Sequence, residues 1–154
     1  MGKNRQRSAD PFFGRRTLSP LVGGLWEAHD RAVAPFGITA RQGAMLLSCS
    51  LGEVETAAEL ARLYAVELSS ATRMLERLER KGLVRRQRSA EDRRKVLIRI
   101  TPAGDKLLRQ ALPKAAAVAQ SAWEGVTAAE RAVLQRVAAK VLRNLGIEPG
   151  RTEK

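Results

Sequence analysis

The side chains best able to do chemistry in this sequence are the arginines and hydroxyl groups between Ser69 and Gly104. Residues 69–100 of this segment, SSATRMLERLERKGLVRRQRSAEDRRKVLIRITPAG, hold eleven Lys or Arg and four Asp or Glu, a net charge of +7. Guanidinium groups bind phosphate through paired hydrogen bonds, and serine and threonine hydroxyls bond phosphates or base edges. The whole chain of 154 residues carries +12. More than half of the excess charge therefore lies in about a fifth of the chain, which predicts a polyanionic partner.

Two helices are predicted to position the first of these side chains. Residues 56–63 and 69–81 repeat apolar residues at helical spacing and are joined by the short stretch YAVEL. This spacing is typical of a helix-turn-helix, whose second helix enters the major groove of DNA. An apolar stripe centred on Leu75 holds that helix on the core. The residues that we expect in the major groove are Ser69, Ser70, Thr72, Arg73 and Arg77.

A β-hairpin is predicted directly after these helices. The segments LVRRQR and KVLIRI alternate with period two, which puts Val96, Ile98 and Ile100 on one face. Arginines at a hairpin tip can reach the minor groove, where A·T pairs concentrate negative potential. The hairpin residues that we expect to contact DNA are Arg88, Arg93 and Arg94.

Asp92 stands among these cations. We expect it to pair with a nearby arginine and hold the tip in one conformation, because a bidentate Asp–Arg contact is directional. Helix-turn-helix spacing, a hydroxyl-rich first turn and an arginine-tipped hairpin together predict a winged helix-turn-helix in a mainly α (α+β) fold.

Capping signals mark where the helices begin. Ser19 before Pro20 predicts an N-cap, and Thr-x-x-Glu/Gln boxes begin at Thr39, Thr56 and Thr127. Thr101-Pro102 begins a further helix, in which Pro113 predicts a kink. Gly82 ends the second helix of the helix-turn-helix, while Pro35 with Gly37, and Gly146 with Pro149, end the first and last helices of the chain.

The chain divides into one domain and two short ends. Residues 1–16 are expected to form a mobile basic arm, with Phe12 and Phe13 docked, and residues 147–154 a tail. Residues 17–148 form the single domain, in which 38–101 make the winged DNA-binding lobe. The segments 17–36 and 102–146 supply a helical dimerisation region from both chain ends.

The dimer is expected because the last two helices carry apolar stripes too extensive to bury against one small winged helix. Intramolecular core remains the alternative for these stripes. The residues concerned are Leu107, Leu108, Leu112, Val133, Leu134, Val137, Val141, Leu142 and Leu145.

Composition argues against other classes of protein. One His, one Cys and no clustered carboxylate pair, glycine-rich phosphate loop or metal-ligand spacing speak against an enzyme, a metal site or a cofactor. No apolar run approaches the roughly 20 residues of a membrane span. We expect a cytoplasmic protein, and the single Cys49 fits a reducing compartment.

The stretch AAELARLYAVELSSATRMLERLERKGLVRRQRSAEDRRKVLIRITPAG resembles the core of the MarR family of bacterial transcription regulators. The family's wing signature, Asp-x-Arg followed by apolar residues and Leu-Thr, maps onto Asp92, Arg94 and the IRIT that ends at Thr101, with Ile100 in place of the commoner leucine. The resemblance covers roughly residues 18 to 145. It implies a triangular homodimer, built by the first and last two helices, that acts as a repressor. It also implies that Arg94 reads the minor groove of a pseudo-palindromic double-stranded operator.

The resemblance also implies release from DNA by small aromatic acids or phenols, bound between the dimerisation helices and the winged helix. The residues that we expect in this pocket are Trp26, His29, Arg31 and Met45. Core packing is the alternative for Trp26 and His29. Some relatives sense oxidants through a cysteine, but the position of Cys49 at the end of the second helix favours a buried structural thiol.

A non-specific architectural or RNA-associated basic protein is the competing hypothesis, because a net charge of +12 suits both classes. Discrimination between DNA sequences at a two-fold symmetric site separates them.

Overall fold

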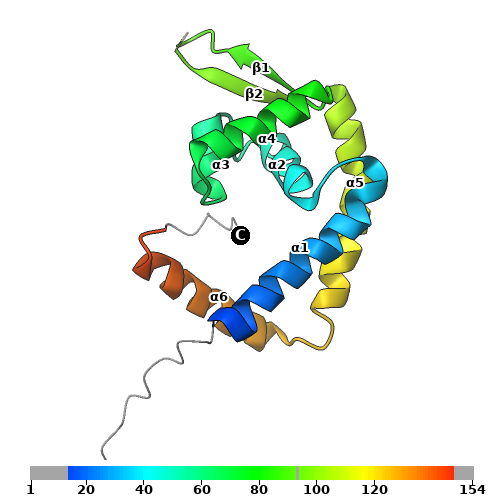
Figure 1. Cartoon of the computed structure of the whole chain (residues 1–154), viewed down its shortest axis with the longest axis vertical. Helices are drawn as coiled ribbons and strands as arrows, with labels where there is room; N and C mark the ends of the chain where they lie inside the picture. The colour runs from blue at the N-terminus through cyan, green and yellow to red at the C-terminus, as the bar shows by residue number, and fades with distance from the viewer. Residues whose placement is uncertain (1–13, 93, 148–154) are drawn as a thin grey trace, which may run out of the picture.

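The computed structural model describes residues 14–92 and 94–147, which form a helical chain with a two-stranded β-sheet. The helices are α1 (Ser19–Val33), α2 (Ala40–Ser50), α3 (Ala57–Leu63), α4 (Leu68–Arg80), α5 (Pro102–Ala122) and α6 (Ala128–Asn144), and the strands are β1 (Val84–Arg88) and β2 (Val96–Ile100). In Figure 1, α3, α4 and the hairpin occupy one end of the molecule, and α5 runs along its side. The start of α1 and α6 lie at the other end. The predicted order of elements is confirmed.

Threonines begin the helices as predicted. The three capping boxes at Thr39, Thr56 and Thr127 are present, each with its hydroxyl accepting the amide three residues further on. Thr101 caps α5 in the same way, accepting the Gly104 amide at 3.0 Å. Each such cap typically contributes about 1 kcal/mol, so the element boundaries follow directly from local sequence.

The start of α1 differs from the prediction. A short π-helical turn, Gly14–Leu18, runs directly into α1, so Ser19 is not an N-cap. Its hydroxyl instead donates to the carbonyl of Gly14 at 3.2 Å, and Pro20 still occupies the first turn, where its missing N–H is tolerated. Residues 14–16, expected in the mobile arm, are therefore helical. Phe12 and Phe13 lie outside the described residues.

Pro35 and Pro113 have different effects on their helices. As predicted, α1 ends before Pro35, in a 3-10 turn that closes at Gly37 with φ of 69°. The helix α5 continues through Pro113 to Ala122, so this proline does not end it, and the kink expected from the lost backbone hydrogen bond stays a prediction. Gly146 has φ of 71° just after α6, while Pro149 lies outside the described residues.

The hairpin is antiparallel, with Val84 opposite Ile100 and Arg88 opposite Val96. Its predicted apolar face faces the core only near the base, where Ile98 is buried and Ile100 half-buried. Val96 is 45% exposed because the outer half of the hairpin projects beyond the helices (Figure 1). The whole hairpin, with this projecting half, is called the wing.

The main core lies between α2, α3, α4, the base of the hairpin and α5. Its most buried large side chains are Met45, Leu46, Leu60, Leu75 and Leu78. Full burial of one such side chain typically stabilises a fold by about 1.5–3 kcal/mol, so this cluster fixes α4 on the lobe. No residue of α6, by contrast, is buried. Within the described ranges no helix is long and apolar enough to cross a bilayer.

Candidate nucleic-acid interface

The helix α4 turns one side to the core and the other to solvent. Its apolar stripe is buried at Ala71, Leu75 and Leu78. Among the residues predicted to enter the major groove, Ser69, Ser70, Arg73 and Arg77 are exposed and Thr72 is half-buried. Neither Arg73 nor Arg77 forms an ion pair with a described residue. The solvent side of α4 thus offers hydroxyl and guanidinium groups, and no described carboxylate pairs with these two arginines.

The first turn of α4 also offers backbone donors. The helix begins at Leu68, and the Glu67 side chain makes no capping hydrogen bond to its first amides. The amides of Leu68 and Ser69 precede the first intrahelical bonds, at Ser70 and Ala71, which both point to the Glu67 carbonyl. Free amides at a helix N-terminus, together with the helix dipole, suit a phosphate group.

The wing tip is organised by Ser89, which the sequence analysis missed. Ser89 is almost fully buried, and its hydroxyl accepts the amides of Glu91 at 3.2 Å and Asp92 at 3.3 Å. Its own amide donates to the carbonyl of Lys95 at 3.0 Å, which closes the tip. Serine at the start of a turn often bonds amides two residues on, and this propensity is the signal that could have identified it.

The contact that Asp92 makes was not predicted, and its pairing with Arg93, which lies outside the described residues, stays a prediction. Its carboxylate accepts the backbone amide of Arg94 at 3.0 Å and forms no ion pair with a described residue. An Asp side chain bonding the amide two residues ahead forms a local turn, which needs no guanidinium. This hydrogen bond still fixes the backbone conformation at Arg94.

The wing arginines fall into two groups. Arg88 and Arg94 are exposed and pair with no described carboxylate, whereas Arg93 lies outside the described residues. Arg86 and Arg99 form ion pairs with glutamates of the same chain, and neither pairing was predicted.

The first engaged arginine ties the wing to α4. The backbone amide of Arg86 donates to Glu79 at 3.0 Å, and its guanidinium lies 3.4 Å from Glu79 and 3.6 Å from Glu76. The second, Arg99, pairs with Glu55 in the loop before α3. Sequence patterns give no signal for these pairs, because the partners come from different elements.

A mostly apolar cavity of about 480 Å³ lies between α1, α2 and α5. Trp26 and His29, predicted to line a ligand pocket, both contribute to its wall. The rest of the wall is formed by Val22, Leu25, Val33, Ala40, Gly43, Ala44, Leu47, Leu108, Ala111, Leu112 and Ala115. The Nδ1 atom of His29 lies 2.7 Å from the Leu25 carbonyl. Since a carbonyl only accepts, Nδ1 carries the proton and a neutral ring keeps a lone pair at Nε2.

The other two predicted pocket residues do not line this cavity. Arg31 is exposed and pairs with Glu27 one helical turn earlier, at 2.8 Å. Met45 is buried in the main core, on the opposite side of α2 from the cavity wall. A cation does lie near the Trp26 end, where the Arg41 guanidinium is 5.2 Å from the centre of the Trp26 ring.

Cys49 lies half-buried in the last turn of α2 and packs against the core. Burial raises the pKa of its thiol to about 11, so it is protonated at neutral pH. Among the described residues Cys49 is the only cysteine, and the hydroxyl of Tyr64 bonds its neighbour Ser48 at 3.0 Å. The expectation of a structural rather than reactive thiol agrees with this environment.

The core-mounted helix α4, preceded by α3 across a short turn and followed by an arginine-bearing hairpin, defines a winged helix-turn-helix protein. The sequence profile of the MarR family matches residues 38–96. The multiple antibiotic resistance protein MarR of Salmonella typhimurium is 33% identical over 140 residues, which cover 88% of this chain and 97% of that protein. The chain belongs to the MarR family of transcription regulators.

Two further relatives extend the comparison. The transcriptional repressor MprA of Escherichia coli is 29% identical over 99 residues, covering 64% of this chain and 49% of that protein. The crystal structure of a mutant MarR from E. coli complexed with operator DNA superposes with a TM-score of 0.70. It is 32% identical, and the match covers 87% of this chain and 99% of that one.

Proposed function

We propose that this chain is a regulator that binds double-stranded DNA sequence-specifically and represses transcription. The observation that carries the proposal is the solvent side of α4, where hydroxyls and arginines that pair with no described carboxylate lie beside an arginine-bearing wing. The similar MarR of E. coli has been crystallised with operator DNA, and the similar MprA is a repressor.

Each DNA-facing group has its own role. On α4, Arg73 and Arg77 would read guanine or bind phosphate, and the hydroxyls of Ser69, Ser70 and Thr72 would bond phosphates or base edges. On the wing, Arg94 would enter the minor groove while Arg88 and Arg93 bind the flanking phosphates. Asp92 would orient Arg94 through its amide.

The protein would act as a homodimer. Residues 38–101 form the DNA-binding lobe, and the segments 17–36 and 102–146 form the dimerisation region. The exposed apolar side chains of α1 and α6 support this division, since no residue of α6 is buried within one chain. A two-fold dimer would place its two α4 helices one DNA turn apart, roughly 34 Å, and would require a pseudo-palindromic operator.

A footprint on the DNA upstream of the protein's own gene tests this function. The purified protein is titrated onto that duplex at physiological salt with excess competitor DNA. A protected, two-fold symmetric site is the expected result. Equal binding to operator and competitor, falling steeply with salt, would instead indicate a non-specific architectural protein.

We further propose that a small phenol in the cavity between α1, α2 and α5 releases the protein from DNA. The wall is mostly aliphatic, with Trp26 available for stacking. In a neutral ring with the proton on Nδ1, the Nε2 lone pair of His29 accepts a hydrogen bond, which a neutral phenol donates and a carboxylate does not. Phenols should therefore bind better than the corresponding aromatic acids.

Calorimetric titration of a phenol and its matched benzoic acid tests this choice of ligand. The variant His29→Phe keeps a ring but removes the acceptor, and should weaken phenol binding by roughly 1–2 kcal/mol, the scale of one buried hydrogen bond. Arg31→Ala, at a residue outside the cavity wall, should leave it unchanged. Tighter binding of the acid than of the phenol would contradict the assignment.

A further inference from the structure

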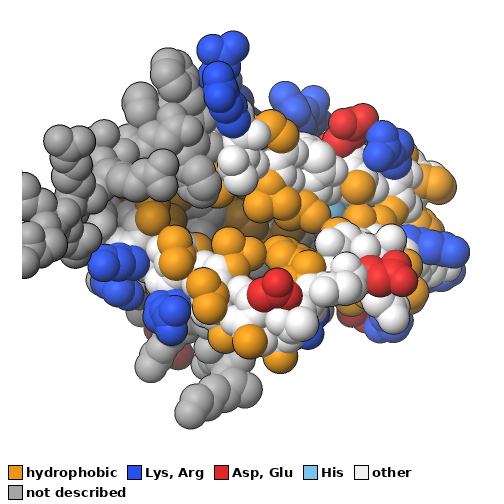
Figure 2. Space-filling model, turned by 90° about the horizontal axis from the view of Figure 1, so that it is seen from below, with side chains coloured by type: hydrophobic (Ala, Val, Ile, Leu, Met, Phe, Trp, Pro, Cys, Tyr) orange, Lys and Arg blue, Asp and Glu red, His pale blue; other side chains and the backbone are white. Residues whose placement is uncertain are grey.

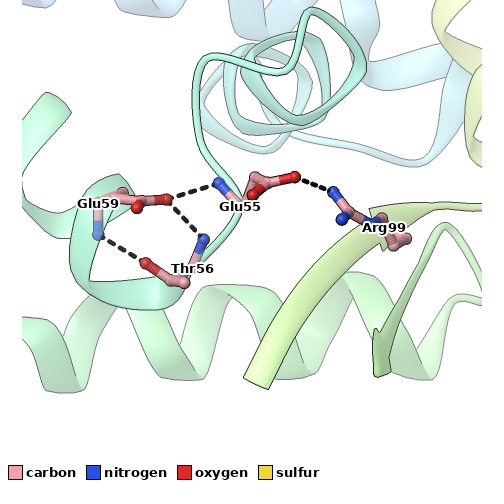
Figure 3. Close-up of polar contacts among 4 residues, drawn as sticks. All are labelled: Glu55, Thr56, Glu59 and Arg99. Carbon is pink, nitrogen blue, oxygen red and sulfur yellow. Dashed lines mark hydrogen bonds and ion pairs between the residues drawn. The ribbon is translucent and has the colours of Figure 1, made fainter. Parts of the chain in front are cut away.

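Glu55, in the loop before α3, joins this loop to the wing by a backbone hydrogen bond and an ion pair, of which Figure 3 shows the ion pair. Its carbonyl accepts the backbone amide of Ile98 at 2.7 Å, so β2 is tied to the loop through the main chain. Its carboxylate pairs with the guanidinium of Arg99, the next residue of β2. Successive residues of the same strand thus contact one glutamate.

Glu55 is itself held by the first helix of the helix-turn-helix. The carboxylate of Glu59 accepts the amide of Glu55 at 2.7 Å and that of Thr56 at 3.0 Å, and the Thr56 hydroxyl accepts the Glu59 amide at 3.2 Å (Figure 3). These hydrogen bonds, with that from Glu55 the largest cause, lower the pKa of Glu59 and keep it ionised. The wing is therefore attached to a loop that the α3 capping box has already fixed.

The opposite face of the hairpin is attached to α4. Arg99 pairs across the sheet with Arg85, and Ile98 with Arg86, so Arg86 and Arg99 lie on opposite faces. Arg86 contacts Glu79 and Glu76 of α4, as described above. A pair on each face leaves the hairpin little freedom to rotate against the helix-turn-helix.

We propose that Glu55 is a positioning residue for DNA binding, which through Arg99 holds the wing at the angle where Arg94 and α4 engage the same duplex. This inference rests on the proposed function. Glu55 contacts no DNA in this role. It acts by fixing the separation of two DNA-binding elements before they meet the operator.

Two properties of Glu55 distinguish a positioning role from a role in folding stability and from a simple effect of its charge on DNA affinity. The side chains of Glu55 and Arg99 are 48% and 43% exposed, so the pair contributes little to folding stability. Glu55 is also negative, and removing a negative charge near DNA should by itself strengthen binding to any duplex. If Glu55 positions the wing, removing its charge should instead weaken binding to the operator, because a more mobile wing loses conformational entropy when it binds.

Affinities of Glu55→Gln for the operator and for a random duplex test the proposal. Glutamine keeps the shape and the backbone bond to Ile98 but loses the charge. Operator affinity should fall roughly threefold to fivefold, the scale of a partly exposed ion pair, while random-duplex affinity stays equal or rises. The matched control is Glu53→Gln, an exposed glutamate two residues earlier that pairs with no described residue. Equal operator affinities for the two variants would overturn the proposal.

Two further variants test the route through the wing. The charge swap Glu55→Arg with Arg99→Glu keeps the net charge and should restore most of the operator affinity. In an Arg94→Ala background, Glu55→Gln should cost little, because the wing no longer has its groove contact. A full additional loss there would contradict the proposal. If the wild-type protein bound the operator no better than a random duplex, the proposed function would be rejected. That result is distinct from equal operator affinities of the Glu55 and Glu53 variants, which would reject only the positioning role.

Discussion

The wing arginines carry the same charge but differ in whether a carboxylate already holds them. Arg86 and Arg99 are paired with glutamates from α4 and the loop before α3, so they are not free to bind phosphate. Arg88 and Arg94 are exposed and pair with no described carboxylate. An arginine without an intramolecular partner does not have to break an ion pair before it binds phosphate. Its full electrostatic attraction to the phosphate therefore contributes to DNA affinity. The charge count of the segment therefore overstates the number of arginines that can bind DNA.

The substitution Arg94→Ala measures one such unpaired arginine. If Arg94 inserts into the minor groove, the variant should lose roughly 1–3 kcal/mol of operator affinity, measured by fluorescence anisotropy. Arg109→Ala removes the same charge from α5, where the arginine pairs with Asp105, and should have little effect. Equal affinities for the two variants would refute the groove contact.

The thiol of Cys49 should react as a buried group. Alkylation by iodoacetamide should be slow at pH 8 and should rise only as the pH approaches its pKa of about 11, against an ordinary value of 9.0. Because the unfolded thiol loses its proton first, stability should fall as the pH rises between these values. Rapid modification of the folded protein at pH 8, at the rate measured in denaturant, would contradict the burial.

At the scale of elements, the threonine capping signals predicted helix starts correctly, the Ser19 signal did not, and contacts between elements were not predicted. Thr39, Thr56, Thr101 and Thr127 cap their helices as predicted, because capping depends on residues three apart. The turn before α4 uses Ala65 with φ of 48°, where glycine would have been the recognisable signal. Pairings between Glu55 and Arg99, or Arg86 and Glu79, depend on tertiary placement, which no spacing in the sequence encodes. The same limit explains why Arg31 and Met45 were expected beside Trp26 and His29 but do not line the cavity between α1, α2 and α5.

Gly104 shows how closely α5 packs against the base of the hairpin. A Cβ at this position would lie 2.1 Å from the Leu83 carbonyl oxygen and 2.9 Å from Ile100 Cγ1. Gly104→Ala should therefore destabilise the fold by roughly 1–3 kcal/mol or more, measured by urea denaturation. Gly43→Ala is the control, since a Cβ there meets only Ile38 at 3.5 Å and a helix interior gains up to about 1 kcal/mol from alanine. Equal stabilities for the two variants would contradict the close packing.

At the scale of the whole molecule, the end formed by α6 and the start of α1 exposes apolar side chains that no core covers. Val133, Leu134, Val137 and Val141 of α6 are all exposed, as are Leu145 directly after it and Leu18, Leu21 and Val22 near the start of α1. Figure 2 shows hydrophobic side chains gathered in two ridges with a hollow between them on the face seen from this end. The prediction that these stripes exceed what one chain can bury agrees with this exposure, although Leu108 belongs to the core. Exposed apolar surface of this extent is typical of an interface rather than of a free surface.

A charge placed in this surface should separate the protomers. Val137 is 50% exposed at the middle of the α6 stripe, so Val137→Glu should not disturb the core of a single chain. In a dimer it would bury an unpaired carboxylate, so sedimentation should show a monomer at micromolar concentration. Gln135→Glu adds the same charge on the other side of α6, where Gln135 is also exposed, and should leave the dimer intact.

A monomer has only one α4 helix to present, so Val137→Glu should also lose the two-fold footprint while keeping weak binding to half-sites. A variant that remained dimeric would show that the two copies meet through another surface.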